Sequence, residues 1–379
     1  MSEGVTALRV LFYSVLNLSH AGGVEIWLSE VCTRLTVEVD IDVSVITTQE
    51  GDIRNPEIKQ KIISHGIELI EIPVVKVGSL ILPKVEGVIA LWRGIKKCDV
   101  VYFNNAFALH EVLIAVLARL AGKKVISAYQ GLFPGYGGFL RQSYHRIINR
   151  WVSKCFDAHH VVNTATFDLL IRMNYKNIYL IPNGVDAHYF KPGQKGGLFT
   201  VLFVGSLSYQ KGFDLFVECV SKLCRECQST VKVVIIGRGT YEINALELAN
   251  TYKNVTYITY ASRDRLRDEY AKAHVLVVPS RFEEFPLAPL EAQASGTPVL
   301  GSDIPGMQMI LYGGEARLKV SLDPDIMVRK IVQLKRVWED DFDTYNKLAL
   351  RARLNAEQYS WPSVIQQLKD MFHKVVSVK

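Results

Sequence analysis

Short apolar runs that alternate with helically spaced segments constrain the fold of this chain most. Val10 to Val15, Val43 to Thr47 and Val100 to Phe103 are such runs. Runs of this length and composition are typical of strands buried on both faces, whereas the segments between them carry apolar residues at helical spacing. This alternation predicts an α/β fold with parallel sheets that helices cover on both sides.

The same pattern begins again in the second half, with runs at Thr200 to Val204 and Val275 to Val278. Pro192 to Gly197 is polar and Gly-rich, so we interpret it as the linker. A length of 379 residues fits two or three domains. We predict two Rossmann-like doubly wound domains facing across a cleft, over residues 1–192 and 193–360. A C-terminal helix over 361–379 is expected to pack back towards the first domain.

The composition excludes several classes of protein. The net charge of +6 is spread evenly over the two halves, so the sequence has no basic arm for nucleic acid. Six scattered cysteines favour a reducing compartment over a disulfide framework, and the Cys224-x-x-Cys227 pair lacks a second pair to complete a zinc site. Without a signal peptide or an apolar run of about 18 residues, a cytoplasmic protein is expected.

The segment from Glu283 to Glu291 is the most informative for function. It follows a predicted strand and opens a helix, so free backbone N–H groups and the helix dipole would face an anion there. Two flanking carboxylates suit a ligand that carries both phosphate and hydroxyl groups. On the two glutamates alone, a solvated Glu283 and a Glu291 on a helix surface would be the better interpretation. Their neighbours change this balance.

The neighbouring segments resemble the family 4 retaining glycosyltransferases. The resemblance covers nearly the whole chain in the right order, through Val277 to Val299, Ile181 to Asp186, Phe203 to Gly212, Gly22 to Glu25, Ile236 to Gly239 and Tyr359 to Trp361. It implies the GT-B fold and a metal-independent transfer from a nucleotide-sugar donor, with no separate cofactor. The N-terminal domain would bind the acceptor and the C-terminal domain the donor.

The resemblance also implies roles for single residues. The nucleotide sugar would be bound by Gly22, Gly23, Gly205, Ser206, Lys211, Tyr260, Phe285, Leu287 and Glu291, and the catalytic residues would be Glu283, Lys211 and Gln130. Glu283 would hold sugar hydroxyls, Glu291 the ribose, and Lys211 the diphosphate, whose charge an ammonium offsets. The loop from Tyr257 to Tyr260 would receive the base.

Three positions depart from the family pattern. Ser206 stands where many members have Arg, so one phosphate-binding cation is missing. Pro286 stands where Gly is usual, and proline has no N–H to offer an anion. Gln130 stands where many members have a His; it still hydrogen-bonds a hydroxyl but gains no charge.

The predicted mechanism is front-side transfer with retention, because no carboxylate is placed as an obvious nucleophile. The protein would supply positioning and charge stabilisation. Asp40-Ile41-Asp42 spells a D-x-D metal motif, but it precedes a strand instead of following one, so a solvated strand start is the better interpretation. No metal site is therefore predicted.

The segment from Arg141 to Lys154 predicts a basic amphipathic helix. Its cations recur about every fourth residue opposite apolar and aromatic positions. Such helices bind anionic membrane surfaces, although a core-facing stripe with solvated cations has the same pattern. A peripheral location on the inner face of the membrane is therefore an open alternative to a purely cytoplasmic one.

The leading hypothesis is a hexosyltransferase that acts on a glycan or a lipid-linked acceptor. A nucleotide-sugar epimerase with the same two domains is the first alternative, and a catalytically weak sugar-nucleotide-binding protein is the second. Ser206, Pro286 and Gln130 are the positions that favour the weak binder. Gly237-Arg238-Gly239 is too short for a dinucleotide fingerprint, so a dehydrogenase is disfavoured.

Overall fold

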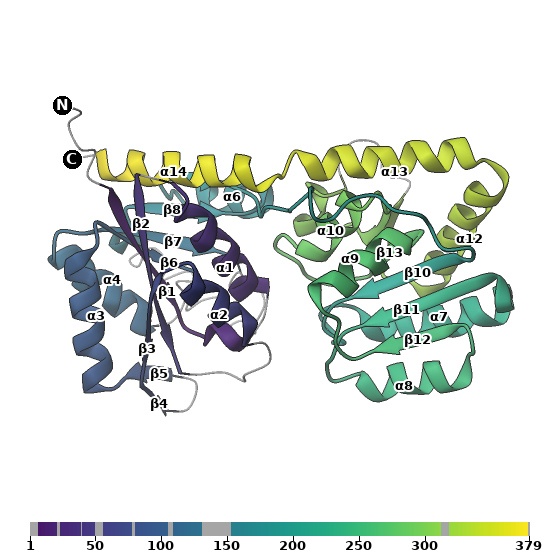
Figure 1. The fold of residues 1–379 in the computed structure, drawn as a ribbon, viewed down its shortest axis with the longest axis horizontal. Helices are drawn as coiled ribbons and strands as arrows, with labels where there is room; N and C mark the ends of the chain where they lie inside the picture. The colour runs from purple at the N-terminus through teal and green to yellow at the C-terminus, as the bar shows by residue number, and fades with distance from the viewer. Residues whose placement is uncertain are drawn as a thin grey trace. The chain divides into compact units, whose positions relative to one another are not determined.

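The computed structural model describes residues 7–20, 23–38, 40–49, 56–77, 80–104, 109–130, 153–311 and 318–377. The chain divides into two compact units, which are described separately below (Figure 1). Unit 1 comprises Met1–Pro182 with Val364–Lys379, and unit 2 comprises Asn183–Ser363. Both are built on parallel sheets covered by helices, so the predicted α/β class is confirmed.

Unit 1 holds a seven-stranded parallel sheet in the order β3-β2-β1-β6-β7-β8-β9. Its strands are β1 (Leu8–Ser14), β2 (Ile41–Thr48), β3 (Glu68–Ile72), β6 (Val100–Phe103), β7 (Lys124–Tyr129), β8 (Ala158–Val161) and β9 (Ile178–Leu180). An antiparallel hairpin of β4 (Val74–Val77) and β5 (Leu80–Pro83) stands apart from this sheet. The strand order reverses between β1 and β6, which marks the ligand-binding edge of such sheets.

Helices cover both faces of the unit 1 sheet. They are α1 (Gly23–Leu35), α2 (Glu57–Ser64), α3 (Val85–Lys97), α4 (Leu109–Leu120), α6 (Thr164–Arg172) and the chain's last helix, α14 (Trp361–Ser377), with short 3₁₀ turns at Leu18–His20 and Ser153–Cys155. Alternate residues of each strand pack on opposite faces of the sheet. Leu11 packs in the core cluster that includes α3 and α4, whereas the Phe12 ring packs against Phe372 of α14.

Ion pairs, as well as aromatic packing, attach the last helix α14 to unit 1. Lys369 Nζ lies 2.6 Å from a Glu38 oxygen and 3.1 Å from Asp40, and His373 Nε2 lies 3.0 Å from the second Asp40 oxygen. The Lys369 ammonium lowers the pKa of Asp40. The first aspartate of the D-x-D sequence is therefore an ion-pair partner at the start of β2.

Unit 2 holds a six-stranded parallel sheet in the order β12-β11-β10-β13-β14-β15. Its strands are β10 (Phe199–Val204), β11 (Val231–Ile236), β12 (Val255–Ile258), β13 (Val275–Val278), β14 (Val299–Ser302) and β15 (Lys319–Val320). Its helices are α7 (Phe213–Cys227), α8 (Glu242–Thr251), α9 (Arg263–Lys272), α10 (Leu287–Ala294), α11 (Pro305–Gln308), α12 (Pro324–Asp340) and α13 (Phe342–Glu357), with a 3₁₀ turn at Gln228–Thr230.

The Gly-rich run at 192–197, interpreted above as the linker, lies within unit 2. Lys195 accounts for this, because its half-buried side chain donates from Nζ to the Ala273 carbonyl at 2.7 Å and to Thr297 Oγ1 at 2.6 Å. Burial lowers the pKa of Lys195 to about 7. This run is therefore attached to unit 2, and the chain passes from unit 1 to unit 2 between Pro182 and Asn183.

No helix among the described residues is long and apolar enough to cross a bilayer.

Candidate functional site

The predicted site in unit 2 lies at the carboxyl ends of its strands. The strand order reverses between β10 and β13, so the loops that follow these two strands meet at one edge of the sheet. The first loop, 205–212, leads into α7, and the second, 279–286, leads into α10. Open α/β sheets bind their ligands at this kind of position.

A compact ion pair joins the two loops. Lys211 Nζ lies 2.7 and 2.8 Å from the two carboxylate oxygens of Glu283, and Ser280 Oγ donates to one of these oxygens at 2.7 Å. The Glu283 side chain is only 7% exposed, whereas that of Lys211 is 29% exposed. Two residues predicted to act together, 72 positions apart in sequence, are thus brought into direct contact.

Gly212 makes this approach possible. Its φ is +65°, and a Cβ placed there would lie 1.9 Å from the Pro279 carbonyl oxygen. Only glycine combines this backbone conformation with such close backbone packing. The position next to Lys211 therefore fixes how near the ammonium comes to the Glu283 loop.

A second ion pair, which the sequence interpretation missed, holds the same loops together. Arg281 donates from its two terminal nitrogens to the two Asp214 oxygens at 2.7 Å each, and its backbone N–H donates to the Gln210 carbonyl at 2.8 Å. The guanidinium also stacks 3.7 Å from the centre of the Tyr209 ring. The bidentate Arg281 contact lowers the pKa of Asp214.

The turn after β10 contains Gly205 and Ser206, as predicted. The Gly205 N–H is used within the sheet, where it donates to the Ile236 carbonyl at 3.0 Å. A Cβ on Gly237 would lie 1.9 Å from the Gly205 carbonyl oxygen, so the turns after β10 and β11 are closely packed. Ser206 is exposed at this edge.

The start of α10 offers backbone N–H groups. Pro286 is its N-cap residue and no side chain caps it, so Leu287 is the first helical residue and is partly exposed. The Phe285 ring is buried against Tyr359, with ring centres 5.3 Å apart, and the Phe285 carbonyl accepts a 2.8 Å hydrogen bond from Asn183. Asn183 was not predicted as a site residue, yet it fixes the backbone directly before this helix.

Glu291 and Tyr260 complete the set predicted in unit 2. Glu291 accepts a 3.0 Å hydrogen bond from the Tyr270 hydroxyl of α9, and both burial and the Glu291 charge raise the pKa of Tyr270. Tyr260 follows β12 and is 55% exposed. The strands β12, β11, β10 and β13 are consecutive neighbours. With about 4.8 Å between strands, they spread these residues over roughly 14 Å of one edge.

This edge combines a lysine ammonium, two carboxylates, a helix N-terminus and an exposed aromatic ring. Such a set binds an elongated ligand that carries an anionic centre, hydroxyl groups and a planar ring. Among the described residues, no group of three or more acidic, histidine or cysteine side chains is arranged to hold a metal ion.

Two family models match the chain. "Glycosyl transferases group 1" matches residues 199–336, which contain the edge just described, and "Glycosyltransferase Family 4" matches residues 21–189. The chain belongs to the family 4 glycosyltransferases. The resemblance on which the sequence analysis relied is therefore confirmed, and the protein is a glycosyltransferase enzyme.

Named relatives and a solved structure agree with this assignment. The glycosyltransferase is 24% identical over 386 residues to a phosphatidylinositol N-acetylglucosaminyltransferase subunit of Arabidopsis thaliana, with 97% of this chain and 82% of that protein covered. It is 26% identical to D-inositol 3-phosphate glycosyltransferase of Gordonia bronchialis over 52% of this chain and 47% of that protein. The crystal structure of Anabaena HepE with UDP-glucose matches with a TM-score of 0.77 at 14% identity, covering 97% and 100% of the two chains. This structural likeness confirms the GT-B fold.

Of the residues predicted in unit 1, Gly23 and Gln130 lie at the carboxyl edge of its own sheet. Gly23 begins α1 and is exposed, with nothing within 4 Å of the position of a Cβ; Gly22 lies outside the described residues. Gln130 follows β7, is half-buried, and its side chain lies near the buried Tyr102 hydroxyl. That hydroxyl lies 2.6 Å from His160 Nδ1. Gln130 thus lies beside a buried pair of polar side chains, which its sequence position alone did not reveal.

Asn104 is a further polar residue of unit 1 that the sequence interpretation missed. It follows β6 directly, beside the reversal of strand order, and is 1% exposed. Its amide nitrogen reaches the Val24 carbonyl at 3.5 Å, near the start of α1. Its position could have been recognised from the sequence, because Asn104 directly follows an apolar strand. Polar residues at that position line the ligand-binding edge of an α/β sheet.

The basic helix predicted from Arg141 to Lys154 lies almost entirely outside the described residues. Of its cations only Lys154 is described, in the 3₁₀ turn Ser153–Cys155. Its backbone carbonyl accepts a 2.6 Å hydrogen bond from Arg119. The membrane role of this helix stays a prediction.

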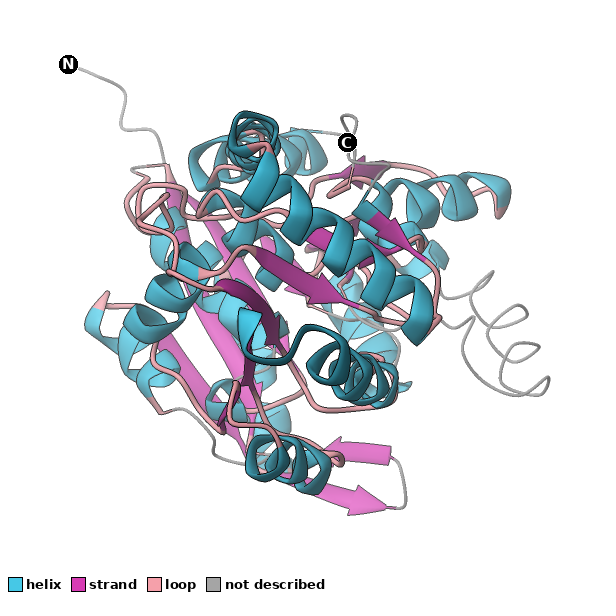
Figure 2. Ribbon diagram, turned by 90° about the vertical axis from the view of Figure 1, so that its right-hand side faces the viewer, coloured by secondary structure: helices cyan, strands magenta, loops and turns pink. Residues whose placement is uncertain are grey.

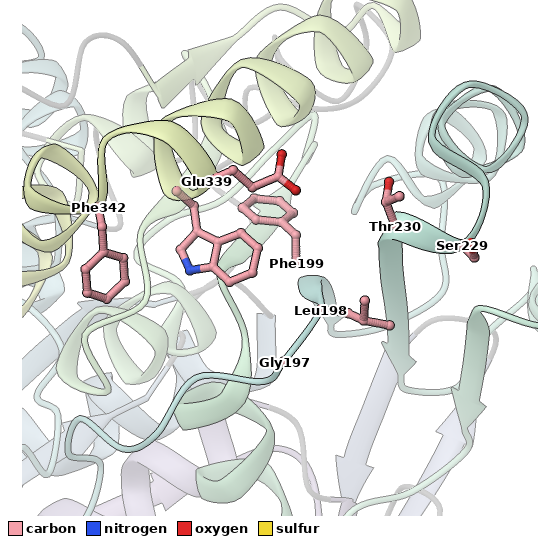
Figure 3. A pocket seen from close by; sticks show the side chains of 8 residues that line it. Gly197, Leu198, Phe199, Ser229, Thr230, Glu339 and Phe342 are labelled. Carbon is pink, nitrogen blue, oxygen red and sulfur yellow. The ribbon is translucent and has the colours of Figure 1, made fainter.

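A hollow of unit 2 lies at a different place from the predicted site. It has a volume of about 740 Å³ and is lined by Phe199, Trp338, Glu339 and Phe342, among others (Figure 3). Phe199 opens β10, so the hollow lies at the amino ends of the strands, away from Lys211 and Glu283. Its lining mixes aromatic and polar residues and includes none of the predicted donor-binding residues.

Proposed function

We propose that this glycosyltransferase transfers a hexose-type sugar from a nucleotide diphosphate sugar to a hydroxyl of a glycan or lipid-linked acceptor, with retention of anomeric configuration and without a metal ion. The observation that carries the proposal is the contact between Lys211 and Glu283 at the reversal of strand order in unit 2. It places a cation and a carboxylate side by side, as a diphosphate joined to a sugar requires.

The donor would lie along the carboxyl edge of unit 2. Lys211 would offset the charge that develops on the leaving diphosphate, and the first N–H groups of α10, including that of Leu287, would add to this effect. Glu283 would accept hydrogen bonds from sugar hydroxyls, and Glu291 from the ribose. Tyr260 would stack on the base.

The ion pair also suggests how the site is held ready before the donor binds. The Lys211 ammonium satisfies the largely buried Glu283 carboxylate. When a diphosphate binds, the same ammonium gains an anionic partner, and the sugar hydroxyls become donors to Glu283. Preorganised charges of this kind favour the transition state because they need little rearrangement.

Retention follows, in this proposal, from departure and attack on the same face of the sugar. The leaving phosphate would take the proton of the acceptor hydroxyl as the new glycosidic bond forms, so the protein would need no nucleophile. Gln130 would hydrogen-bond a donor-sugar hydroxyl, a role that its contact with Tyr102 would orient. Gly23, which has no side chain, would let the backbone approach the phosphate or sugar of the donor closely.

The names of the relatives guide the choice of acceptors for a first trial. One is named for phosphatidylinositol and the other for D-inositol 3-phosphate, so these two compounds belong in the panel beside simple glycans. UDP-glucose and UDP-N-acetylglucosamine are the first donors, because HepE was crystallised with the former and the Arabidopsis relative is named for the transfer of N-acetylglucosamine.

Donor binding and turnover can be measured separately. A nucleotide sugar that binds only the folded state raises the melting temperature by mass action, and Glu291→Gln is expected to reduce this shift. Nucleotide release that needs an acceptor supports transfer. An isomerised donor sugar without acceptor would instead indicate an epimerase, and binding without any turnover would indicate a weak sugar-nucleotide-binding protein.

A further inference from the structure

The outward face of α3 in unit 1 carries a row of exposed apolar side chains. Val85, Val88, Ile89 and Trp92 follow one another at helical spacing and are between 39% and 73% exposed. The opposite face of the same helix is buried through residues such as Leu91. A helix that covers a sheet normally presents polar residues to water, so this second apolar stripe needs a partner.

Helix α4 repeats the pattern. Leu113, Val116, Leu117 and Leu120 have the same spacing and are between 38% and 79% exposed. Among the α4 residues whose exposure is described, Arg119 is the single exposed polar side chain.

The two stripes point away from the same side of the sheet. The inner faces of α3 and α4, which include Leu91 and Ile114, pack into one core cluster. Strand β5 contacts both helices, so the β4–β5 hairpin borders the stripes. The hairpin stands outside the main sheet, as the lower edge of Figure 2 shows, and its Val75 is 45% exposed. We call the two stripes together the α3–α4 face.

Cations accompany the α3–α4 face. Lys84 precedes α3, and Arg93 and Lys96 lie on α3 beside its stripe; all three are exposed. Arg119 of α4 is also exposed, but its guanidinium donates to the Lys154 carbonyl and lies 4.0 Å from an Asp157 oxygen, so it is not counted with these cations. Lys96 Nζ lies 5.1 Å from the centre of the Trp92 ring. Glu86 is the single exposed acidic side chain on α3. A tryptophan beside lysines is the combination found where apolar side chains meet lipid headgroups.

We propose that the α3–α4 face docks on an anionic phospholipid membrane, with its aliphatic side chains and Trp92 at the boundary between headgroups and acyl chains. The cations would then meet lipid phosphates, each adding to the attraction. A second copy of the chain fits this face less well, because two-fold association would bring cations of one sign against each other. Docking of this kind does not depend on the proposed transfer reaction.

Vesicle flotation tests the docking with the whole chain. Phosphatidylcholine vesicles that contain phosphatidylserine should bind the protein and float it to the top of a density gradient. Leu113→Asp/Leu117→Asp should abolish this binding. Leu350→Asp/Leu354→Asp is the matched control, because these leucines of α13 have the same spacing and similar exposure but lie in unit 2. Arg93→Gln/Lys96→Gln should weaken binding by about five-fold for each charge removed. Circular dichroism melting confirms that each variant is folded.

Fluorescence locates the contact. Lipids brominated on their acyl chains should quench the tryptophan fluorescence of the parent protein. Trp92→Phe should remove most of this quenching. The proposal is overturned if the parent does not float, or if Leu113→Asp/Leu117→Asp floats as well as its control. It is also overturned if quenching survives in Trp92→Phe. Loss of a lipid-independent dimer in the leucine variant, without flotation of the parent, would assign the face to a second copy of the chain.

Discussion

Replacing Lys211 by methionine separates its catalytic role from its structural one. At an effective dielectric constant of about 20, unit charges about 4 Å apart attract by about 4 kcal/mol, and partial exposure of the lysine reduces this value. The Glu283 carboxylate would then retain the hydrogen bond from the Ser280 hydroxyl but lose its cation. We therefore expect the free energy of unfolding to fall by about 1–2 kcal/mol. If Lys211 also stabilises the leaving diphosphate, kcat should fall by about 10²–10³-fold.

The assay is nucleotide release at saturating acceptor, with urea denaturation of the same samples. Lys211→Met/Glu283→Gln should recover the lost stability, because the buried charge is removed, but should not recover kcat. Lys222→Met is the control: its side chain is 30% exposed and its Nζ lies 2.7 Å from Asp325, in a surface ion pair far from this edge. A kcat of Lys211→Met within about two-fold of the parent, together with the expected loss of stability, would refute the diphosphate role.

Three further predictions concern the ribose contact, the loop junction and acid stability. Glu291→Gln should raise the KM for the donor by about ten-fold or more with a smaller change in kcat, as donor titrations would show. Gly212→Ala should lower the free energy of unfolding by more than about 2 kcal/mol in urea, because its Cβ would overlap the Pro279 carbonyl; Gly66→Ala, at φ +72° in open space, should cost only about 1 kcal/mol. Burial lowers the pKa of His159 and His160 to about 4, so the unfolded chain binds protons that the folded chain does not. Stability should hold above the ordinary histidine pKa of about 6.5 and fall as the pH drops from there to about 4, as urea titrations would show.

The layered fold was predictable because its strands are short, apolar and regularly spaced. Val10 to Val15 overlaps β1, and Val275 to Val278 coincides with β13. Parallel strands buried on both faces leave a strong signal in sequence, since most of their positions are apolar. The place of the run at 192–197 was not evident from its composition. Glycine content indicates local freedom of the backbone and does not reveal that the half-buried Lys195 attaches the run to unit 2.

Some residues of the candidate edge were named from the sequence, but their contacts were not predictable. Lys211 and Glu283 were each expected near the donor, whereas their direct ion pair depends on the backbone approach at Gly212. Long-range pairs such as Arg281 with Asp214 leave no local periodicity to detect.

The apolar stripes on α3 and α4 were hidden for a related reason. Helical spacing shows that apolar residues recur, but on these helices they recur on two faces, and only packing shows which face the core covers.

The measurement that tests the central claim most directly is a proton NMR time course with a nucleotide sugar and an acceptor. The proposal predicts that the donor's anomeric signal disappears only when acceptor is present. It also predicts that the coupling constant of the anomeric proton in the product indicates the same anomeric configuration as in the donor. A product of inverted configuration would contradict the retaining mechanism, and conversion of the donor without acceptor would contradict the assignment of this edge to glycosyl transfer.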